Sequence, residues 1–266
     1  MTSTEEFLAW AEHDRNRSPH TLARYAAVLT ALAQHGDPLV LDAEQVEAWW
    51  ASRYEMAPAT RANELACLRS FYKWATRFDH RPDDPPRRLD PPSVPNKVPR
   101  PIGQSDLGRL LGELTEDTPD LRRAGALGAY GGLRVAEAAS LEWSAIDQEA
   151  RRIYVRGKGR KERVFGLSPL LLDIILPEAA GNVVTAGGDP YTGATLQRKL
   201  NRLMERSGIA HTFHDLRKRA ATLAIASTGN HLAVAQAFGW ASIETASHYA
   251  VVGDETIDAI AAAVAR

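Results

Sequence analysis

The chain has 266 residues, a formal net charge of −1 and a hydrophobic fraction of 44%. These values exclude global disorder and leave room for one large domain or two ordinary ones. The single cysteine, Cys67, excludes an internal disulfide, and no apolar run reaches membrane-spanning length. Because the start MTSTEEF is acidic and lacks the apolar stretch of a secretory signal, we expect a cytoplasmic protein.

Residues 1–80 are predicted to form a helical domain. Ser18 followed by Pro19 is a typical helix start, because proline fits the first turn, and Gly36 is a typical helix end. Asp42 is a candidate N-cap for the next helix, AEQVEAWWASRY. The pattern therefore favours short helices joined by short turns in this part of the chain.

A further helix of this domain opens at Pro58 and carries two kinds of side chain. Its apolar stripe consists of Leu65, Leu68 and Tyr72. Beside the stripe lie three basic residues, Arg61, Arg69 and Lys73. Cations on such a helix can contact a phosphate backbone, and a face that only meets water is the alternative.

A proline-rich stretch follows the helical domain. Eight prolines fall within residues 79–101. Proline fixes φ and removes the backbone donor, so this stretch is predicted to be neither helix nor central strand. We interpret residues 81–101 as an extended linker to a second domain over residues 102–266.

The second domain is predicted to be helical with a small antiparallel sheet. Helical patterns occupy residues 106–114, 121–132, 194–207, 214–228 and 231–238. Between them, RRIYVRG and RKERVFGL are β-branched and aromatic runs around Gly157-Lys158-Gly159. This arrangement predicts a β-hairpin with a lysine at its tip, so the fold class is mostly α.

Charge is unevenly placed along the chain. Residues 1–50 hold eight acids and three Lys/Arg, whereas residues 151–165 hold seven Lys/Arg and one acid. Residues 198–219 hold seven Lys/Arg and two acids. A nearly neutral chain can thus present a basic surface to an anion, although solvated faces are the alternative for either cluster alone. The candidate phosphate contacts in these clusters are Arg160, Lys161, Arg198 and Lys199.

Four segments contain residue types suited to phosphate chemistry. They are GGLRVAEAASLEWSAID with Arg134 and Glu137, VRGKGRKERVFGLS with Lys158, FHDLRKRAAT with His214 and Arg217, and FGWASIETASHYAVV with Trp240 and Tyr249. In this order they resemble the catalytic domain of the tyrosine recombinases, the phage-integrase and Xer-like family. RSPHTLARYAAVLTAL with LRSFYKWAT is similar to the helical, SAM-like core-binding domain of that family. The resemblance covers nearly the entire chain.

The resemblance implies a role for most of these side chains. Arg134 and Arg217 would hold the non-bridging oxygens of a DNA phosphate, a task that suits arginine because its forked guanidinium stays charged. Tyr249 would attack and form a covalent 3′-phosphotyrosine. A phenol has a pKa of about 10, so it needs a base, and His214 suits that role. Lys158 would protonate the departing 5′-oxygen.

Two further positions and one absence complete the expected site. Many family members carry histidine where Trp240 stands, and an indole N–H can donate to a phosphate but cannot shuttle a proton. Glu137 follows Arg134 by three residues on one helical side and is a candidate to orient an arginine or histidine. The eight histidines lack metal-ligand spacing, and no ATP-binding motif is found, so we expect neither metal nor cofactor.

The resemblance also implies partners. We expect double-stranded DNA recombination sites, held in a clamp formed by the two domains, and a homo-tetramer on two sites. A monomer free in solution and an accessory directionality factor are compatible with this reading, and no membrane partner is expected. Residues 254–265 are where the family docks one protomer onto the next, with packing in the same chain as the alternative.

Several functions remain open at this point. The core-binding resemblance begins within the first ten residues, so we expect no additional arm-binding domain. A phage or mobile-element integrase is the first interpretation, and a Xer-type chromosome or plasmid dimer resolvase is the second. A type IB topoisomerase would share the chemistry, but the helical N-terminal pattern argues against it. A non-catalytic DNA-binding relative would lack catalytic residues that this chain retains.

Overall fold

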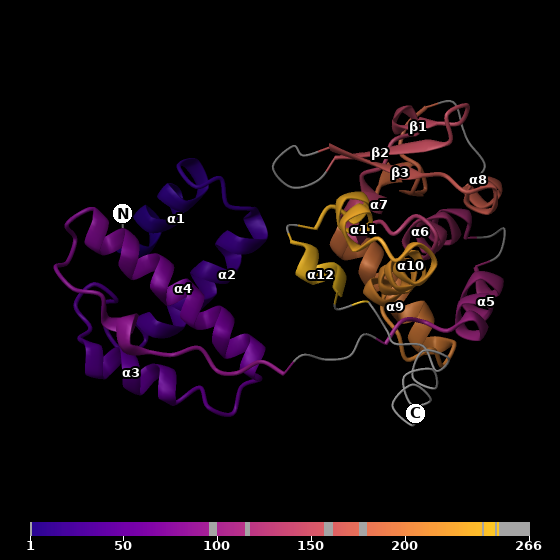
Figure 1. Ribbon diagram of the computed structural model, residues 1–266. Helices are drawn as coiled ribbons and strands as arrows, with labels where there is room; N and C mark the ends of the chain where they lie inside the picture. Colours follow the sequence, from indigo (N-terminus) through magenta and orange to yellow (C-terminus); the bar gives the residue numbers. More distant parts are fainter. Residues whose placement is uncertain are drawn as a thin grey trace, which may run out of the picture. The chain divides into compact units, whose positions relative to one another are not determined.

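The chain divides into two units, Met1–Asn96 and Lys97–Arg266, and each has its own hydrophobic core (Figure 1). The computed structural model describes residues 2–95, 100–114, 118–156, 162–175, 180–240, 242–247 and 249. The predicted hairpin tip and the segment 254–265 lie outside these residues. Within the described ranges, no helix is both long enough and apolar enough to span a bilayer.

Unit 1 is helical, as predicted. It consists of α1 (Ser3–His13), α2 (Pro19–Ala33), α3 (Ala43–Ala51), α4 (Pro58–Arg77) and the 3-10 turn η1 (Pro85–Arg88). The Ser18 side chain caps α2 and Pro19 occupies its first turn. Asp42 caps α3, and Pro58 opens α4. These local start signals therefore fix three of the helix boundaries.

Helix α1 is not among the predicted elements. Thr2 caps it in a capping box with Glu5, in which each side chain bonds the backbone amide of the other residue. Its Phe7 is fully buried, with ring centroids 5.4 Å from Phe71 and 5.6 Å from Trp74 of α4. Burial of one such ring contributes about 1.5–3 kcal/mol, which holds α1 on α4. The predicted α4 stripe of Leu65, Leu68 and Tyr72 lies in the same core.

The proline-rich stretch begins packed on unit 1 and corrects the extended linker predicted over residues 81–101. The Nη1 atom of Arg81 donates to the carbonyls of Leu39 and Leu41 at 3.2 and 2.9 Å. Its Nη2 atom lies 2.7 Å from a carboxylate oxygen of Asp83. These bonds neutralise a guanidinium that is almost fully buried and tie the stretch to the α2–α3 turn.

The next residues of this stretch are also part of unit 1. The turn η1 contains two prolines, which the first turn of a helix tolerates because its N–H groups have no intrahelical partner. Leu89 follows η1 and is 6% exposed in the core of the unit. The prediction of an extended linker does not hold for residues 85–89, because proline restricts the interior of a helix rather than its start and Leu89 packs into the core.

Unit 2 is helical with two small antiparallel sheets. Its helices are α5 (Gln104–Glu113), α6 (Pro119–Ala129), α7 (Val135–Ala139), α8 (Pro169–Ile175), α9 (Gly193–Arg206), α10 (Phe213–Thr228), α11 (His231–Phe238) and α12 (Ile243–Ser247), with the 3-10 turn η2 (Trp143–Ala145). Its strands are β1 (Ile146–Asp147), β2 (Arg152–Arg156), β3 (Glu162–Gly166), β4 (Thr185–Ala186) and β5 (Asp189–Pro190). The predicted fold class, mostly α with a small antiparallel sheet, is confirmed.

The predicted hairpin is formed by β2 and β3, which pair with β1 in the order β1-β2-β3. Val155 faces Arg163 across the hairpin, and Ile153 faces Phe165. Ile153 and Val155 are buried in the main core of the unit, so this face of β2 is turned toward the helices. In Figure 1 the three strands lie on one side of unit 2, with α7 and α11 next to β3.

Helices α6 and α10 pack closely against each other next to the site. A Cβ atom added to Gly128 of α6 would lie 3.0 Å from the ring of Phe213 at the start of α10. The absence of a side chain thus lets α10 approach α6 closely. Since α6 leads into Arg134 and α10 carries His214 and Arg217, this contact brings the two predicted arginines into one region.

Candidate active site

Arg134 stands at the entrance of α7. It is the N-cap residue, with an extended backbone, and it follows the turn that ends α6. Its Nη1 atom bonds Glu137 Oε1 at 2.9 Å, and its Nη2 atom bonds the Gly239 carbonyl at 3.1 Å. The side chain is 44% exposed. A guanidinium has five N–H donors, so Arg134 is held from one side and keeps donors for a phosphate.

Glu137 is the buried carboxylate at the centre of the site. Its Oε2 atom accepts from the Arg134 amide at 2.6 Å, and both oxygens accept from Arg163 at 2.8 and 2.9 Å. Arg217 Nη1 lies 3.7 Å from Oε2. Burial would raise the pKa of Glu137, but hydrogen bonds from Arg163 and Arg134 more than offset it and hold the pKa at about 2. The group is therefore ionised at neutral pH.

Arg217 is the more deeply buried of the two predicted arginines, at 3% exposed. It donates to the carbonyls of Gly132 and Phe238 at 2.5 and 2.6 Å. Its guanidinium carbon lies 5.1 Å from the ring centroid of Phe238 and 5.9 Å from that of Trp240. Burial, and then the positive charge of Arg134, lower the pKa of Arg217 to about 9, so it is protonated at neutral pH.

Two glycines supply the carbonyls that orient the arginines. Gly132 and Gly239 have φ of +60° and +61°, a left-handed conformation that glycine adopts without steric cost. The Gly132 carbonyl accepts from Arg217, and the Gly239 carbonyl accepts from Arg134. A Cβ atom on Gly132 would lie 2.6 Å from the Phe238 ring, so the close approach also requires glycine.

Tyr249 belongs to an aromatic stack that lies next to Arg217. Its ring stacks on Trp240 with centroids 5.0 Å apart and an interplanar angle of 6°. Trp240 in turn packs on Phe238 at 5.1 Å. The Trp240 ring centroid lies 5.9 Å from the Arg217 guanidinium carbon, so the stack adjoins that arginine. Stacking on Trp240 thus holds the predicted nucleophile, Tyr249, close to the arginines of the site.

His214 is an exposed residue of the first turn of α10, one turn before Arg217. Partial withdrawal of its ring from water lowers the pKa of His214, and the charges of Lys218, Arg217 and Arg134 lower it further. Asp215, which is paired with Lys218 at 2.7 Å, opposes this shift. At neutral pH the imidazole is therefore neutral and able to accept a proton.

The arrangement has a clear electrostatic consequence. Three guanidinium groups, those of Arg134, Arg163 and Arg217, surround one carboxylate, that of Glu137. Their formal charges sum to two positive charges in excess. A site with an excess of fixed cations and forked donors suits a phosphodiester, whose charge grows as it is attacked.

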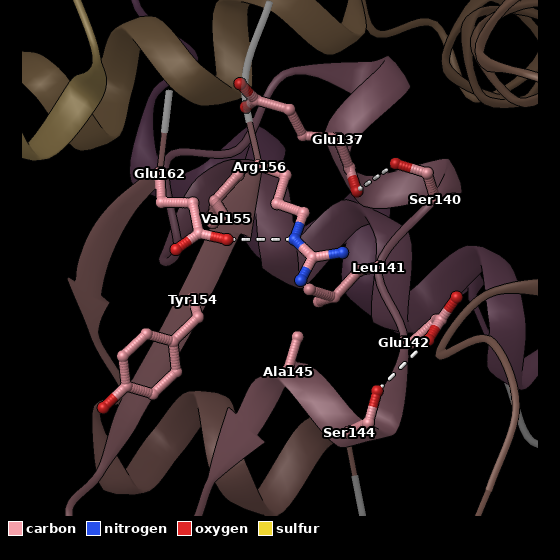
Figure 2. Close-up of a pocket in the computed structure, with 10 residues that line it drawn as sticks. All are labelled: Glu137, Ser140, Leu141, Glu142, Ser144, Ala145, Tyr154, Val155, Arg156 and Glu162. Atoms are coloured by element: carbon pink, nitrogen blue, oxygen red, sulfur yellow. Dashed lines mark hydrogen bonds and ion pairs between the residues drawn. The ribbon is translucent and has the colours of Figure 1, made fainter. Parts of the chain in front are cut away.

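A pocket of about 340 Å³ lies beside this cluster, between the hairpin, α7 and η2 (Figure 2). Glu137, Glu142 and Glu162 line it together with Arg156, and the Arg156 Nε atom bonds Glu162 at 3.0 Å. Carboxylates outnumber cations there, so the pocket does not suit a phosphate. Among the residues with described positions, no group of three or more His, Cys, Asp or Glu could hold a metal ion.

Comparison with known proteins agrees with this geometry. The model of the Phage integrase family matches residues 103–255, which is more than half of the chain, and that of the Phage integrase N-terminal SAM-like domain matches residues 4–78. The chain belongs to the phage integrase family. Within this family it is a tyrosine site-specific recombinase, as predicted.

Similar curated proteins are Xer enzymes. Tyrosine recombinase XerC of Rhodospirillum centenum is 30% identical, over 94% of this chain and 83% of its own length. XerC of Xylella fastidiosa is 27% identical, over 92% and 90%. XerC of an Escherichia coli O157:H7 strain is 27% identical, over 93% and 91%. The likeness thus extends across both units of this family member.

Solved structures share the fold. A lambda integrase dimer bound to a COC′ core site has a TM-score of 0.75 and 19% identity, covering 93% of each chain. XerH recombinase bound to a palindromic difH substrate has a TM-score of 0.76 and 17% identity, covering 99% of this chain and 85% of its own. At these identities the comparison establishes the recombinase fold.

The structure brings most of the predicted catalytic residues of this recombinase together. Arg134 and Arg217 share Glu137, His214 lies in the field of both arginines, and Tyr249 stacks on Trp240. Lys158 lies outside the described residues, as do Arg160 and Lys161.

The predicted DNA contacts whose positions are described lie on two helices, α4 and α9. On α4, the Arg61 guanidinium lies 4.2 Å from the Trp50 ring, and Arg69 bonds the Leu89 carbonyl, so both also serve packing within unit 1. Lys73 of the same helix is exposed. On α9, Arg198 and Lys199 are exposed, and Lys199 Nζ lies 3.0 Å from the Tyr191 hydroxyl. Their contact with DNA stays a prediction.

Arg163 is a residue of the site that sequence reasoning missed. It counted only as one of seven basic residues in the hairpin region. The missed signal is the alternation of a β-strand, because Arg163 pairs with Val155, which is buried. An arginine opposite a core valine is an inward-facing cation and requires a buried partner.

Proposed function

We propose that this recombinase cuts and rejoins double-stranded DNA through a covalent 3′-phosphotyrosine on Tyr249. The observation that carries the proposal is the convergence of Arg134 and Arg217 on the carboxylate of Glu137, with the Trp240–Tyr249 stack next to Arg217. Side chains from segments far apart in the chain meet where the charge is in excess, which is the arrangement that a phosphoryl-transfer site needs.

The two arginines would have different duties. Arg134 reaches the phosphate from an exposed position with donors to spare, while Glu137 and the Gly239 carbonyl fix its direction. Arg217 is fixed by two carbonyls beneath the aromatic stack and supplies charge with little reorganisation. Such preorganised donors stabilise the charge that develops on the equatorial oxygens during attack.

The proton transfers would use the other predicted residues. The Tyr249 oxygen attacks phosphorus while its proton passes to His214, which is neutral at pH 7 because its pKa is lowered. The bond from phosphorus to the 5′-oxygen breaks, and Lys158 supplies a proton to that oxygen. Trp240 positions the phenol by stacking and has an indole N–H that can donate to the phosphate. Resealing reverses these steps.

We infer double-stranded DNA recombination sites as the partner, bound by both units with a homo-tetramer on two sites. The related structures include a lambda integrase dimer on a core site and a lambda integrase tetramer on a Holliday junction. Arg61, Arg69, Lys73, Arg160, Lys161, Arg198 and Lys199 are the proposed phosphate contacts. Residues 254–265 are the segment proposed to dock one protomer onto the next. Because its substrate would be chromosomal or phage DNA, we expect the enzyme to act in the cytoplasm.

Two biological roles fit this chemistry. Integration of a phage or mobile element is the first, as the sequence analysis proposes. Resolution of chromosome or plasmid dimers is the second, and the XerC relatives that match nearly the whole chain support it. A plasmid with two copies of the chromosomal dimer-resolution site, compared with a pair of attachment sites, distinguishes them by which pair recombines.

A nicked suicide substrate tests the proposed chemistry. The wild-type protein should form a covalent complex that survives denaturation. The short fragment that bears the free 5′-hydroxyl diffuses away, and its loss prevents resealing. Tyr249→Phe should abolish the complex, whereas Tyr154→Phe, which removes the hydroxyl of an exposed tyrosine on β2, should leave it unchanged. A complex retained in Tyr249→Phe contradicts the proposal. Relaxation of plasmid without recombination would instead indicate a topoisomerase.

A further inference from the structure

Arg163 differs from the other arginines of the hairpin. Its side chain is 8% exposed, whereas that of Arg156 is 86% exposed and Arg152 also faces water. Burying a guanidinium is costly unless its charge and its N–H groups are matched. The position therefore indicates a specific set of partners rather than a solvated cation.

Those partners belong to two separate helices, α7 and α11. Arg163 Nη1 and Nη2 bond the two carboxylate oxygens of Glu137 at 2.8 and 2.9 Å, and Nε bonds the Ala237 carbonyl at 2.8 Å. Only the planar fork of arginine matches a carboxylate in this bidentate way. Arg163 thus joins β3 to α7 and to the end of α11.

Both groups that hold the Arg134 guanidinium are in contact with Arg163. The first is Glu137, whose Oε1 atom accepts from Arg163 and from Arg134 together. The second is Gly239, whose carbonyl accepts from Arg134. A Cβ atom on Gly239 would lie 3.0 Å from the Arg163 Cδ atom, so the stem of Arg163 packs directly on this glycine.

We propose that Arg163 is a positioning residue for strand cleavage, which sets the direction of the Arg134 guanidinium through Glu137 and Gly239. It acts from β3, which follows residues 157–161 in the chain, and it ties this strand to α7 and α11. The inference rests on the proposed function, because Arg134 matters in this way only if it binds the scissile phosphate.

The first test compares Arg163→Lys and Arg163→Met with wild type in single-turnover cleavage of the suicide substrate. Misplacing a phosphate-binding group by about 1 Å costs roughly 10²-fold in rate, so Arg163→Met should cleave about 10²-fold more slowly. Arg163→Lys keeps the charge but cannot bond both carboxylate oxygens of Glu137 and the Ala237 carbonyl together. Its cleavage rate should lie between those of the wild type and Arg163→Met. DNA affinity should stay within a few-fold, and Arg152→Met is the matched exposed control on the same hairpin.

The second test separates positioning from a general structural role. If Arg163 acts on Arg134 partly through Glu137, the rate loss of the double variant Arg163→Met/Glu137→Gln should be smaller than the product of the two single losses. Rate losses that multiply in the double variant would overturn the inference, as would wild-type cleavage by both single variants. Failure of the wild-type protein to form any covalent complex would instead refute the proposed function itself.

Discussion

Each unit of the molecule buries an arginine against backbone carbonyls, and the two arginines have different surroundings. Arg81 of unit 1 donates to carbonyls of the α2–α3 turn and has its own carboxylate partner, Asp83, at 2.7 Å. Arg217 of unit 2 donates to the carbonyls of Gly132 and Phe238. The carboxylate near Arg217, that of Glu137, is shared with two further arginines.

The difference shows how to distinguish structural from functional arginines. A guanidinium with a carboxylate of its own is neutralised and serves to hold a segment in place. A guanidinium in a cluster with surplus positive charge is incompletely neutralised, and this surplus is available to an anion from outside. Solvent exposure does not separate the two cases, because Arg81 and Arg217 are 8% and 3% exposed.

The largest effect is expected for Arg217→Lys. Lysine keeps the positive charge but lacks the fork of arginine. It therefore cannot bond the carbonyls of Gly132 and Phe238 and a phosphate oxygen at the same time. We expect cleavage to slow about 10³-fold, or roughly 4 kcal/mol, with little change in DNA affinity. Single-turnover cleavage of the suicide substrate measures this rate. Arg81→Lys is the matched control. If it lost as much cleavage rate as Arg217→Lys, the distinction between a structural and a functional arginine would be wrong.

Arg81→Met should have the opposite pattern. Removing the guanidinium leaves Asp83 without its partner and the carbonyls of Leu39 and Leu41 without their donor. We expect the free energy of unfolding of unit 1 to fall by about 2 kcal/mol, since the carbonyls lose their donor, whereas Asp83, whose side chain is 55% exposed, stays hydrated. Urea unfolding followed by tryptophan fluorescence measures it, and cleavage at 25 °C should be unchanged. An unaltered unfolding midpoint would contradict the structural role.

A smaller effect is expected from Lys218, whose charge helps to lower the pKa of His214. A base must be deprotonated, so the cleavage rate should fall tenfold per pH unit as the pH drops below the pKa of His214, which lies under the ordinary histidine value. Lys218→Gln removes a cation and leaves Asp215, which raises that pKa, so the acid limb should move to higher pH. Arg219→Gln is the neighbouring control, and identical limbs would argue against His214 as the base.

The sequence predicts the parts of the fold that depend on local signals. Ser18, Asp42 and Pro58 start helices where expected, and the hairpin of β2 and β3 follows its apolar and β-branched pattern. Helix α1 was missed although Thr2 and Glu5 form a capping box that the sequence displays. The packed start of the linker was missed because Arg81 acts on carbonyls some forty residues away, which no local pattern reveals.

The site could be predicted as a set of residues but not as a network. The order of the motifs predicts Arg134, His214, Arg217 and Tyr249 as site residues. The sharing of Glu137 among three arginines depends on how α7, α10 and β3 pack, so it emerges only in the folded chain. The carbonyl bonds of Arg217 depend on left-handed backbone at Gly132 and on the end of α11.

The most direct test of the central claim is to find which atom of the protein becomes attached to DNA. The trapped covalent complex is digested with nuclease and trypsin, and the adduct is located by mass spectrometry. Cleavage after Arg219 yields residues 220–266, which contain a single tyrosine, Tyr249. We predict that a nucleotide is attached to the Tyr249 oxygen through its 3′-phosphate. An adduct on any other residue, or no adduct in a protein that recombines DNA, would contradict the account.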